Sequence, residues 1–272
     1  MTSSPAEAAL TAPAAGARRV SADPTALARL LAIAAVAVAV LAAWQWLPPA
    51  LGVPRFIVPT LSETWAEFGR MIVRDNLGRH ALSTLWTALA GFALGSLLGA
   101  VAGYALGLSR FWESVLSPYI LALQIAPKVA FAPLFIMWFG YTAWPKLLVT
   151  VLVVFFPVLV NVMGAVRTAD RDYLRLARAY ALTRGQTFRK VLFPLSLPAL
   201  LAGLKISATL AVIGVTVGEL VGGNTGLGFL ITYGEGQSNT AMVFVAIILL
   251  TLIGIALFAA VGAAERRLLR YL

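Results

Sequence analysis

Long apolar stretches are the feature of this sequence that most constrains how the chain can fold. Residues 81–108 carry no charged side chain, and about 18 or more such residues are enough to cross a bilayer as a helix. Continuous apolar runs favour helices over barrel strands, in which apolar and polar residues would alternate. Six stretches predict an all-α, polytopic membrane protein with six transmembrane helices: residues 30–47, 81–108, 115–139, 147–166, 195–220 and 240–264.

Two of these stretches leave an alternative open. Residues 115–139 contain Pro118, Pro127 and Pro133, which could split the third span into two pieces because proline interrupts a helix. Residues 30–47 could instead belong to a signal peptide, but they exceed the roughly 7–15 apolar residues of a signal sequence. We therefore expect six spans, of which the third is the least regular.

Composition excludes several kinds of chemistry. Hydrophobic residues make up 60% of the 272 residues and charged residues 12%, which leaves too few polar side chains to coat a soluble domain. The chain has no cysteine, so disulfides, thiolate metal sites and cysteine nucleophiles are excluded. Its one histidine, His80, stands at the edge of the second span without a cluster of partner residues. We interpret His80 as an interfacial residue and expect no metal site.

The distribution of positive charge predicts the orientation, because cytoplasmic loops of membrane proteins are enriched in lysine and arginine. With the N-terminus inside, 14 of the 21 basic residues fall on the cytoplasmic side: Arg18, Arg19, Arg29, Arg110, the seven basic residues of 167–190, Arg266, Arg267 and Arg270. Both termini are therefore expected in the cytoplasm. Residues 1–25 are predicted to form a disordered cytoplasmic tail, and residues 26–272 the transmembrane domain.

Two further patterns concern the packing of the helices. In the outer connection, residues 61–73 place apolar side chains at helical spacing and predict a short amphipathic helix at the membrane interface. In the second span, glycine recurs every fourth residue, which gives a smooth stripe where a neighbouring backbone can approach closely. Packing within the chain is favoured over a dimer face for this stripe: Gly91, Gly95, Gly99, Gly103 and Gly107.

The segment 167–193 combines positive charge with a helical pattern. Residues 167–190 contain seven basic and two acidic residues. Thr183 and Gln186 have the spacing of a capping box, which predicts that a second helix begins there. An ordinary basic loop that touches anionic lipids is one interpretation, and a docking surface for a partner protein is the other. The first helix carries an apolar stripe: Tyr173, Leu176, Ala177, Tyr180 and Ala181.

Several motifs occur in an order that resembles a known family. Residues 176–183 read Leu-Ala-Arg-Ala-Tyr-Ala-Leu-Thr and resemble the "EAA" loop of ABC importer permeases, in particular the nitrate/sulfonate/taurine branch of the binding-protein-dependent family. The resemblance runs from about Pro54 to the C-terminus. The other matching motifs are residues 126–134, 138–140, 156–161, 188–194, 197–198, 218–220 and 222–228.

The chain departs from the family pattern at two positions of this loop. Arg175 stands where the motif has glutamate, and Ala181 where it has glycine six residues later. Gly185 follows in the turn. The docking role is still expected, with a partner surface adapted to arginine. The residues that the resemblance assigns to ATPase coupling are Asp172, Arg175, Leu176, Ala177, Arg178, Tyr180, Ala181, Thr183 and Gly185.

The resemblance implies a type I importer in the bacterial plasma (inner) membrane. Two permease subunits, expected to be a homodimer, form the pathway; two separate ATPase subunits bind ATP and magnesium; and a substrate-binding protein docks outside. A coupling helix at about residues 172–183 would insert into a groove on each ATPase. The chain itself is expected to have no enzymatic activity and no cofactor or metal, and to contact membrane lipids but no nucleic acid. It has no G-x-x-x-x-G-K-[ST] nucleotide loop, and residues 222–228 are interpreted as an extracellular turn.

Polar residues inside apolar spans are candidates for the translocation pathway because unpaired charges are costly in lipid. Lys128 follows Pro127 and could face the cavity, where it would suit an anionic substrate, or extend to the interface. Glu219 could gate the pathway, pair with Lys128 or be solvated. Lys205 is expected to extend to the inner interface. The predicted pathway residues are Gln124, Lys128, Asn161 and Glu219, although hydrogen bonds between helices are favoured for the two amides.

We therefore predict the membrane-spanning subunit of an ATP-driven importer for a small polar, anionic organic solute. Nitrate, taurine, alkanesulfonates, aromatic carboxylates, thiamine pyrimidine precursors and riboflavin all fit this branch. An ion-gradient-driven secondary transporter would instead predict inverted repeats and carboxylates near mid-membrane, and the sequence has only Glu219 there. An intramembrane enzyme would need clustered His, Asp or Glu residues, which the sequence lacks.

Overall fold

The computed structural model describes residues 24–169 and 171–271, and helices are the only regular secondary structure in this part of the chain. Residues 1–23 of the expected tail lie outside the described residues. The elements are α1 (Pro24–Ala50), α2 (Leu61–Arg74), α3 (Leu77–Gly107), α4 (Arg110–Ile125), η1 (Lys128–Phe131), α5 (Ala132–Phe139), α6 (Ala143–Arg167), α7 (Arg171–Ala179), α8 (Arg184–Thr187), η2 (Phe188–Leu192), α9 (Phe193–Gly222), α10 (Leu227–Gly236), α11 (Thr240–Leu268) and η3 (Leu269–Tyr271).

The spans agree with the predicted six. Five stretches of helix are long and apolar enough to cross a membrane, and a sixth span results when α4 and the η1–α5 segment are taken together. These two parts are bent by 80°. Pro127, at the break, has a non-helical ψ of 87°, and its ring removes a backbone donor. The third span is thus present but broken, which is the alternative that its prolines left open.

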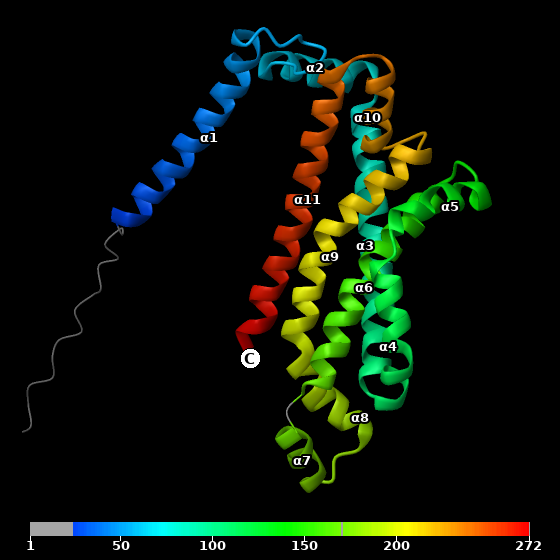
Figure 1. Cartoon of the computed structure of the whole chain (residues 1–272). Coiled ribbons are helices and arrows are strands. Elements are labelled where there is room, and N and C mark those ends of the chain that lie inside the picture. The colour runs from blue at the N-terminus through cyan, green and yellow to red at the C-terminus, as the bar shows by residue number, and fades with distance from the viewer. Residues whose placement is uncertain (1–23, 170, 272) are drawn as a thin grey trace, which may run out of the picture.

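Helix α6 forms the centre of the bundle and packs along α3 on one side and α9 on the other (Figure 1). Helices α2 and α10 lie at one end, which we call the α2 end, and α7 and α8 lie at the opposite end, the α7 end. Helix α1 extends away from the bundle, and its side chains are exposed from residue 27 to residue 41. Most of the described core therefore belongs to α3, α6, α9, α10 and α11, with Met71 of α2 and Ala132 of α5 also fully buried.

The glycine stripe of α3 lies against α6. A Cβ atom built on Gly95 would lie 2.8 Å from the carbonyl oxygen of Val151, and one on Gly103 would lie 2.8 Å from that of Leu159. Real side-chain atoms do not approach a backbone this closely, so only glycine lets the two helices meet. The interpretation of the stripe as packing within the chain is confirmed.

Helix α2 confirms the amphipathic helix predicted for residues 61–73. A capping box begins it: the Glu63 N–H donates to Thr60 Oγ1 at 3.3 Å, and the Thr60 N–H donates to the Glu63 carboxylate at 2.9 Å. The latter bond lowers the pKa of the Glu63 carboxyl. The Trp44 indole N–H donates to the Pro59 carbonyl at 3.0 Å, which ties the end of α1 to the start of α2.

Candidate functional site

Lys128 lies at the break of the third span, where η1 begins. Its Nζ donates to the carbonyl oxygen of Gln124 at 2.6 Å and lies 4.9 Å from the ring centroid of Phe156 on α6. The lysine is half-buried, and Gln124 is exposed. Because α4 ends at Ile125, the Gln124 carbonyl has no helical N–H partner four residues on. The lysine therefore caps the broken helix with a charged group that stays partly accessible.

Asn161 lies half-buried in α6. Its Nδ2 donates to the carbonyl oxygen of Pro157 at 2.8 Å, a bond within α6 rather than the hydrogen bond between helices that we favoured. A Cβ on Gly203 of α9 would lie 3.2 Å from the Asn161 Cβ. Asn161 thus lies beside the contact between α6 and α9.

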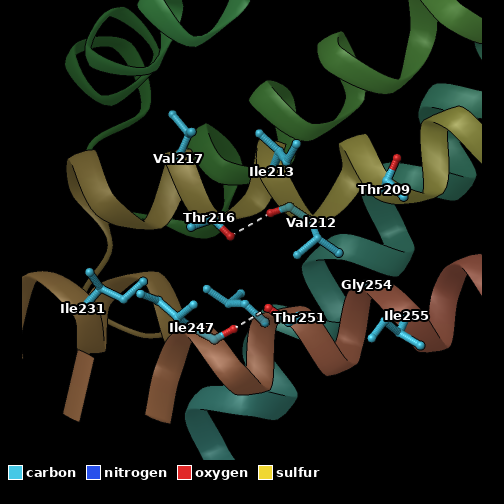
Figure 2. Close-up of a pocket in the computed structure, with 11 residues that line it drawn as sticks. Thr209, Val212, Ile213, Thr216, Val217, Ile231, Ile247, Thr251, Gly254 and Ile255 are labelled. Carbon is cyan, nitrogen blue, oxygen red and sulfur yellow. Dashed lines mark hydrogen bonds between the residues drawn. The ribbon is translucent and has the colours of Figure 1, made fainter. Parts of the chain in front are cut away.

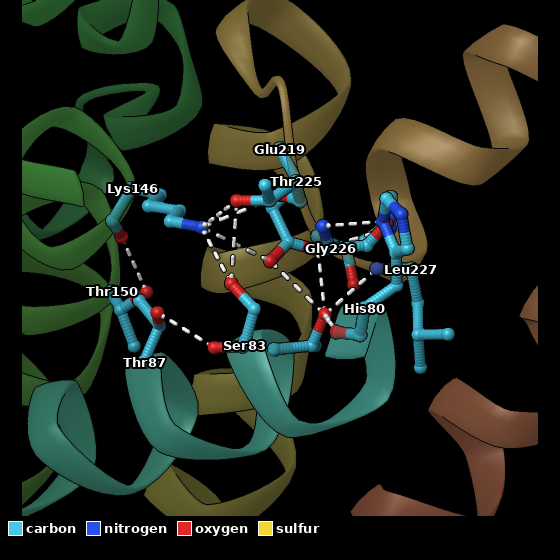
Figure 3. A network of polar contacts seen from close by, with 12 residues as sticks. His80, Ser83, Thr87, Lys146, Thr150, Glu219, Thr225, Gly226 and Leu227 are labelled. Atoms are coloured by element: carbon cyan, nitrogen blue, oxygen red, sulfur yellow. Dashed lines mark hydrogen bonds and ion pairs between the residues drawn. The ribbon is translucent and has the colours of Figure 1, made fainter. Parts of the chain in front are cut away.

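Glu219 is fully buried near the end of α9 (Figure 3). Its carboxylate accepts hydrogen bonds from Thr84 Oγ1 at 2.9 Å and from the Gly228 N–H at 2.9 Å. The nearest cation is Lys146 of α6, whose Nζ lies 3.7 Å from Oε1. The expected alternatives of a pair with Lys128 and of a solvated carboxylate are therefore wrong. The hydrogen bonds and the nearby ammonium group explain how a buried carboxylate can remain charged in an apolar bundle.

Lys146 lies in the first turn of α6, and its side chain is 7% exposed. Its Nζ also donates to Ser83 Oγ at 3.1 Å and to Thr225 Oγ1 at 3.3 Å. Hydropathy and charge counting miss this residue because it follows a turn and precedes the apolar run. The signal that could have found it is Pro145, which suits the first turn of a helix.

Lys205 of α9 forms an ion pair with Glu265 of α11. This pairing holds two adjacent spans together near the α7 end. We expected Lys205 to extend to the inner interface and did not expect this pair with a carboxylate.

The basic segment forms the helix–turn–helix that its pattern predicted, with a shorter first helix. Helix α7 ends at Ala179, whereas we expected a helix to about residue 183. The Leu182 N–H donates to the Ala177 carbonyl at 3.0 Å and the Ala181 N–H to the Arg178 carbonyl at 2.9 Å, which is the Schellman pattern. Ala181 has a φ of +51°. It therefore lies in the turn that ends α7 and not on the apolar stripe.

The surface of α7 is well exposed. Leu176 is 53% exposed and Tyr180 74%, and Ala177 is the buried member of the stripe. Arg175 pairs with Asp172 at 2.9 Å, and both side chains are mostly exposed. An ion pair of this kind contributes little to stability, so the surface is not explained by packing within the chain.

The second helix of the pair begins as predicted. The Gln186 N–H donates to Thr183 Oγ1 at 3.3 Å, and the Thr183 N–H donates to Gln186 Oε1 at 2.9 Å, which confirms the capping box. A Cβ on Gly185 would meet nothing within 4 Å. The turn between α7 and α8 thus has a defined geometry.

A cavity of about 520 Å³ lies between α9, α10 and α11 (Figure 2). It could not be predicted from the sequence, because its lining is aliphatic apart from three threonines. Thr216 and Thr251 donate to carbonyl oxygens one turn earlier on their own helices, at 2.7 and 2.8 Å. Their hydroxyls are therefore occupied, and the cavity presents an apolar surface.

A bundle of candidate membrane-spanning helices with a broken span and an exposed basic helix pair at one end is the architecture expected of a polytopic membrane permease. The model of the family described as binding-protein-dependent transport system inner membrane component matches residues 95–270, and the chain belongs to this family. The resemblance of the sequence motifs is thereby confirmed.

Two relatives cover most of the chain. The riboflavin transport system permease protein RibX of Chloroflexus aurantiacus is 41% identical over 84% of this chain and 85% of that protein. The putative aliphatic sulfonates transport permease protein SsuC of Bacillus subtilis is 32% identical over 85% of this chain and 84% of its own length. An inward-facing structure of the MetNI methionine ABC transporter matches 71% of this chain and 95% of that chain, at 20% identity and a TM-score of 0.61.

The chain is therefore a multi-pass inner-membrane permease subunit of an ABC importer. It is not the catalytic subunit, and such a system has a separate ATPase and a substrate-binding protein as partners. Membership in this family excludes both the secondary transporter and the intramembrane enzyme.

Proposed function

We propose that two copies of this chain form the translocation pathway for a small polar organic solute that carries negative charge. The α7 end then faces the cytoplasm and the α2 end faces outward, with both termini in the cytoplasm. The positive charge at the α7 end supports this orientation: α7, α8 and η2 together contain Arg171, Arg175, Arg178, Arg184, Arg189 and Lys190.

We base the proposed substrate class on the position of Lys128. A partly accessible cation at a helix break inside an apolar span is costly unless it has a function. Its ammonium group donates to a neutral carbonyl, so its charge is available to an anion. Gln124, whose side chain is exposed beside it, and Asn161 on α6 add polar groups to the same proposed pathway.

Riboflavin-like solutes are a second candidate, because RibX is 41% identical to this chain. A neutral heterocycle would need stacking and apolar contacts more than a cation. Phe156, whose ring centroid lies 4.9 Å from the Lys128 Nζ, is 5% exposed and therefore offers little surface for such stacking.

Transport is proposed to follow ATP-driven closure of the ATPase dimer, which moves the two α7 helices and turns the pathway outward. The solute then enters from the binding protein and is released inward after hydrolysis. The exposed face of α7 supports this role, because Tyr173, Leu176 and Tyr180 present apolar surface without a partner helix.

Two measurements test the proposal. First, the cognate binding protein is heated with riboflavin, taurine, an alkanesulfonate, nitrate, an aromatic carboxylate or a thiamine pyrimidine precursor, and the ligand that raises its melting temperature is identified. Second, ATP-dependent uptake of that ligand is measured in vesicles that contain this chain and its ATPase. We expect an anion. Stabilisation by riboflavin alone would replace the first candidate with the second, and absence of ATP-dependent uptake would contradict both.

A further inference from the structure

Helix α10 begins without a side-chain cap of its own, because its N-cap residue is Gly226. The first N–H groups of a helix need partners from outside the helix. Side chains of other helices supply them (Figure 3): Gly226 N–H donates to His80 Nδ1 at 3.1 Å, Leu227 N–H to Thr84 Oγ1 at 2.8 Å and Gly228 N–H to Glu219 Oε2 at 2.9 Å. Glu219 thus caps α10 from α9, and the positive end of the helix dipole favours its negative charge.

The loop from 223 to 226 is shaped around this carboxylate. A Cβ on Gly226 would lie 2.0 Å from Glu219 Oε1, and one on Gly228 would lie 2.7 Å from the Glu219 Cβ. Gly226 also has a φ of +119°, which side chains rarely permit. The glycine-rich sequence is therefore explained by the carboxylate inside it and needs no external ligand.

Lys146 supplies the opposite charge from α6. Glu219 is 0% exposed and the Lys146 side chain 7%, so both charges are removed from water. Loss of one member would leave the other charged, buried and uncompensated, which is more damaging than loss of both. The pair and Thr84 connect four helices, α3, α6, α9 and α10, at one point.

Helix α6 connects this point to the other end of the bundle. Its 25 residues make a helix about 37 Å long. Lys146 lies in its first turn, and Arg167 ends it, a few residues before α7. Because α6 packs along α3 and α9, a displacement of Lys146 must displace the helix that leads into α7.

We propose that Glu219 and Lys146 are positioning residues of the transport cycle. Their ion pair clamps the 223–226 loop and the start of α10 to α3 and α6, so that a movement at the α2 end reaches α7 through α6. This inference rests on the proposed function for its role in transport, while the clamp itself is a property of the chain alone.

Cysteine labelling tests the clamp directly. The chain has no cysteine, so Leu227→Cys is a unique reporter at a 0% exposed position beside the loop. In this background, Glu219→Gln is expected to speed maleimide labelling about tenfold or more, because it leaves Lys146 unpaired. Ala132→Cys, also 0% exposed but on α5, is the matched control and should label at an unchanged rate.

Two further variants test whether the ion pair and its hydrogen bonds are what protect position 227 from labelling. Thr84→Val removes the hydroxyl that joins Glu219 to the Leu227 N–H without changing any charge, and it should also speed labelling at position 227. The double variant Glu219→Gln/Lys146→Met should label more slowly than either single variant, because it leaves no buried charge unpaired. Wild-type labelling rates in both Glu219→Gln and Thr84→Val, or additive effects in the double variant, would overturn the clamp.

The transport role has its own measurement. In vesicles with the ATPase, Glu219→Gln should keep basal ATP hydrolysis within about twofold and lose most of its stimulation by the binding protein, with partial recovery in the double variant. A merely structural defect would lower basal hydrolysis and assembly together. Normal stimulation in Glu219→Gln would overturn the role in transport. Failure of the wild-type chain to associate with an ATPase would contradict the proposed function and leave the labelling result valid.

Discussion

Gly99 of α3 lies so close to α6 that a Cβ atom built on it would be 2.5 Å from the carbonyl oxygen of Phe155. The same atom would lie 3.1 Å from the Cβ of Val158. Neither neighbour is the flexible end of a side chain, so the contact cannot adapt by a simple rotamer change. The distance between α3 and α6 is thus set by the absence of a side chain at position 99.

We expect Gly99→Leu to disrupt folding or assembly. Forcing a large side chain into a packed contact costs about 1–3 kcal/mol or more, and here it would push apart the two helices that form the centre of the bundle. The measurement is the yield and melting temperature of the detergent-solubilised protein. Gly164→Leu is the matched control, since a Cβ on Gly164 of α6 meets nothing within 4 Å. Equal behaviour of the two variants would show that Gly99 does not set the spacing.

The spans and the glycine stripe could be predicted because each depends on a local pattern, either long uncharged runs or a four-residue period. Lys146 could not, since its burial depends on groups that are far away in sequence. Ser83, Thr225 and Glu219 surround its Nζ, and they come from two other spans and a loop. Glu219 could be recognised from the sequence as an unusual charge, but Lys128, the cation expected beside it, was the wrong one.

Substitution of Lys128 by methionine should impair uptake of an anionic solute while assembly stays intact. The lysine is half-buried and its ammonium group binds one carbonyl of α4, so its removal leaves no buried charge unpaired. If a solute anion meets this cation, loss of a charge-assisted contact should lower uptake about tenfold or more. Lys128→Arg keeps the charge and serves as the control. Uptake kinetics of Lys128→Met that match wild type would remove Lys128 from the pathway.

Ala181→Gly should stabilise the turn that follows α7. Ala181 has a φ of +51° at the C′ position of a Schellman motif, where glycine is favoured because it has no Cβ. The left-handed conformation costs an alanine about 1–2 kcal/mol, of which the greater freedom of glycine in the unfolded chain offsets about 0.5–1 kcal/mol. Limited trypsin digestion should cut the α7–α8 turn more slowly in this variant.

Ala179→Gly is the control for this comparison, because Ala179 is the last residue of α7. Glycine within a helix costs up to about 1 kcal/mol relative to alanine, so trypsin should cut this variant faster. If Ala181→Gly were cut as fast as Ala179→Gly, the positive φ of Ala181 would not be a source of strain.

The end of α7 could not be predicted from the spacing of its apolar residues. Apolar residues continue at helical spacing from Tyr173 to Ala181, which predicts one helix to about residue 183. The chain nevertheless leaves the helix after Ala179, because the carbonyls of Ala177 and Arg178 are satisfied by a turn instead of another helical residue. A glycine at position 181 would have indicated that the helix ends there, whereas an alanine at this position gives no such indication.

Reversal of charge on α7, by Arg175→Glu with Arg178→Glu, should uncouple transport from ATP hydrolysis. Arg175 is exposed and pairs with Asp172 on the same helix. The double variant places like charges three residues apart, which costs only a few tenths of a kcal/mol within α7. In a contact with an ATPase adapted to arginine, like charges can cost several kcal/mol. The expected result is a normal level in the membrane, reduced ATPase co-purification and lost uptake.

Insertion should survive this change because Arg167, Arg171, Arg184, Arg189 and Lys190 keep the segment positive. Arg266→Glu with Arg267→Glu is the control, since it changes the charge by the same amount in the last turn of α11, away from the α7 surface. That variant should retain the ATPase. If α7 meets only lipid headgroups, ATPase binding should persist in both variants. Retention of both the ATPase and uptake after reversal at 175 and 178 would therefore rule out α7 as the docking helix.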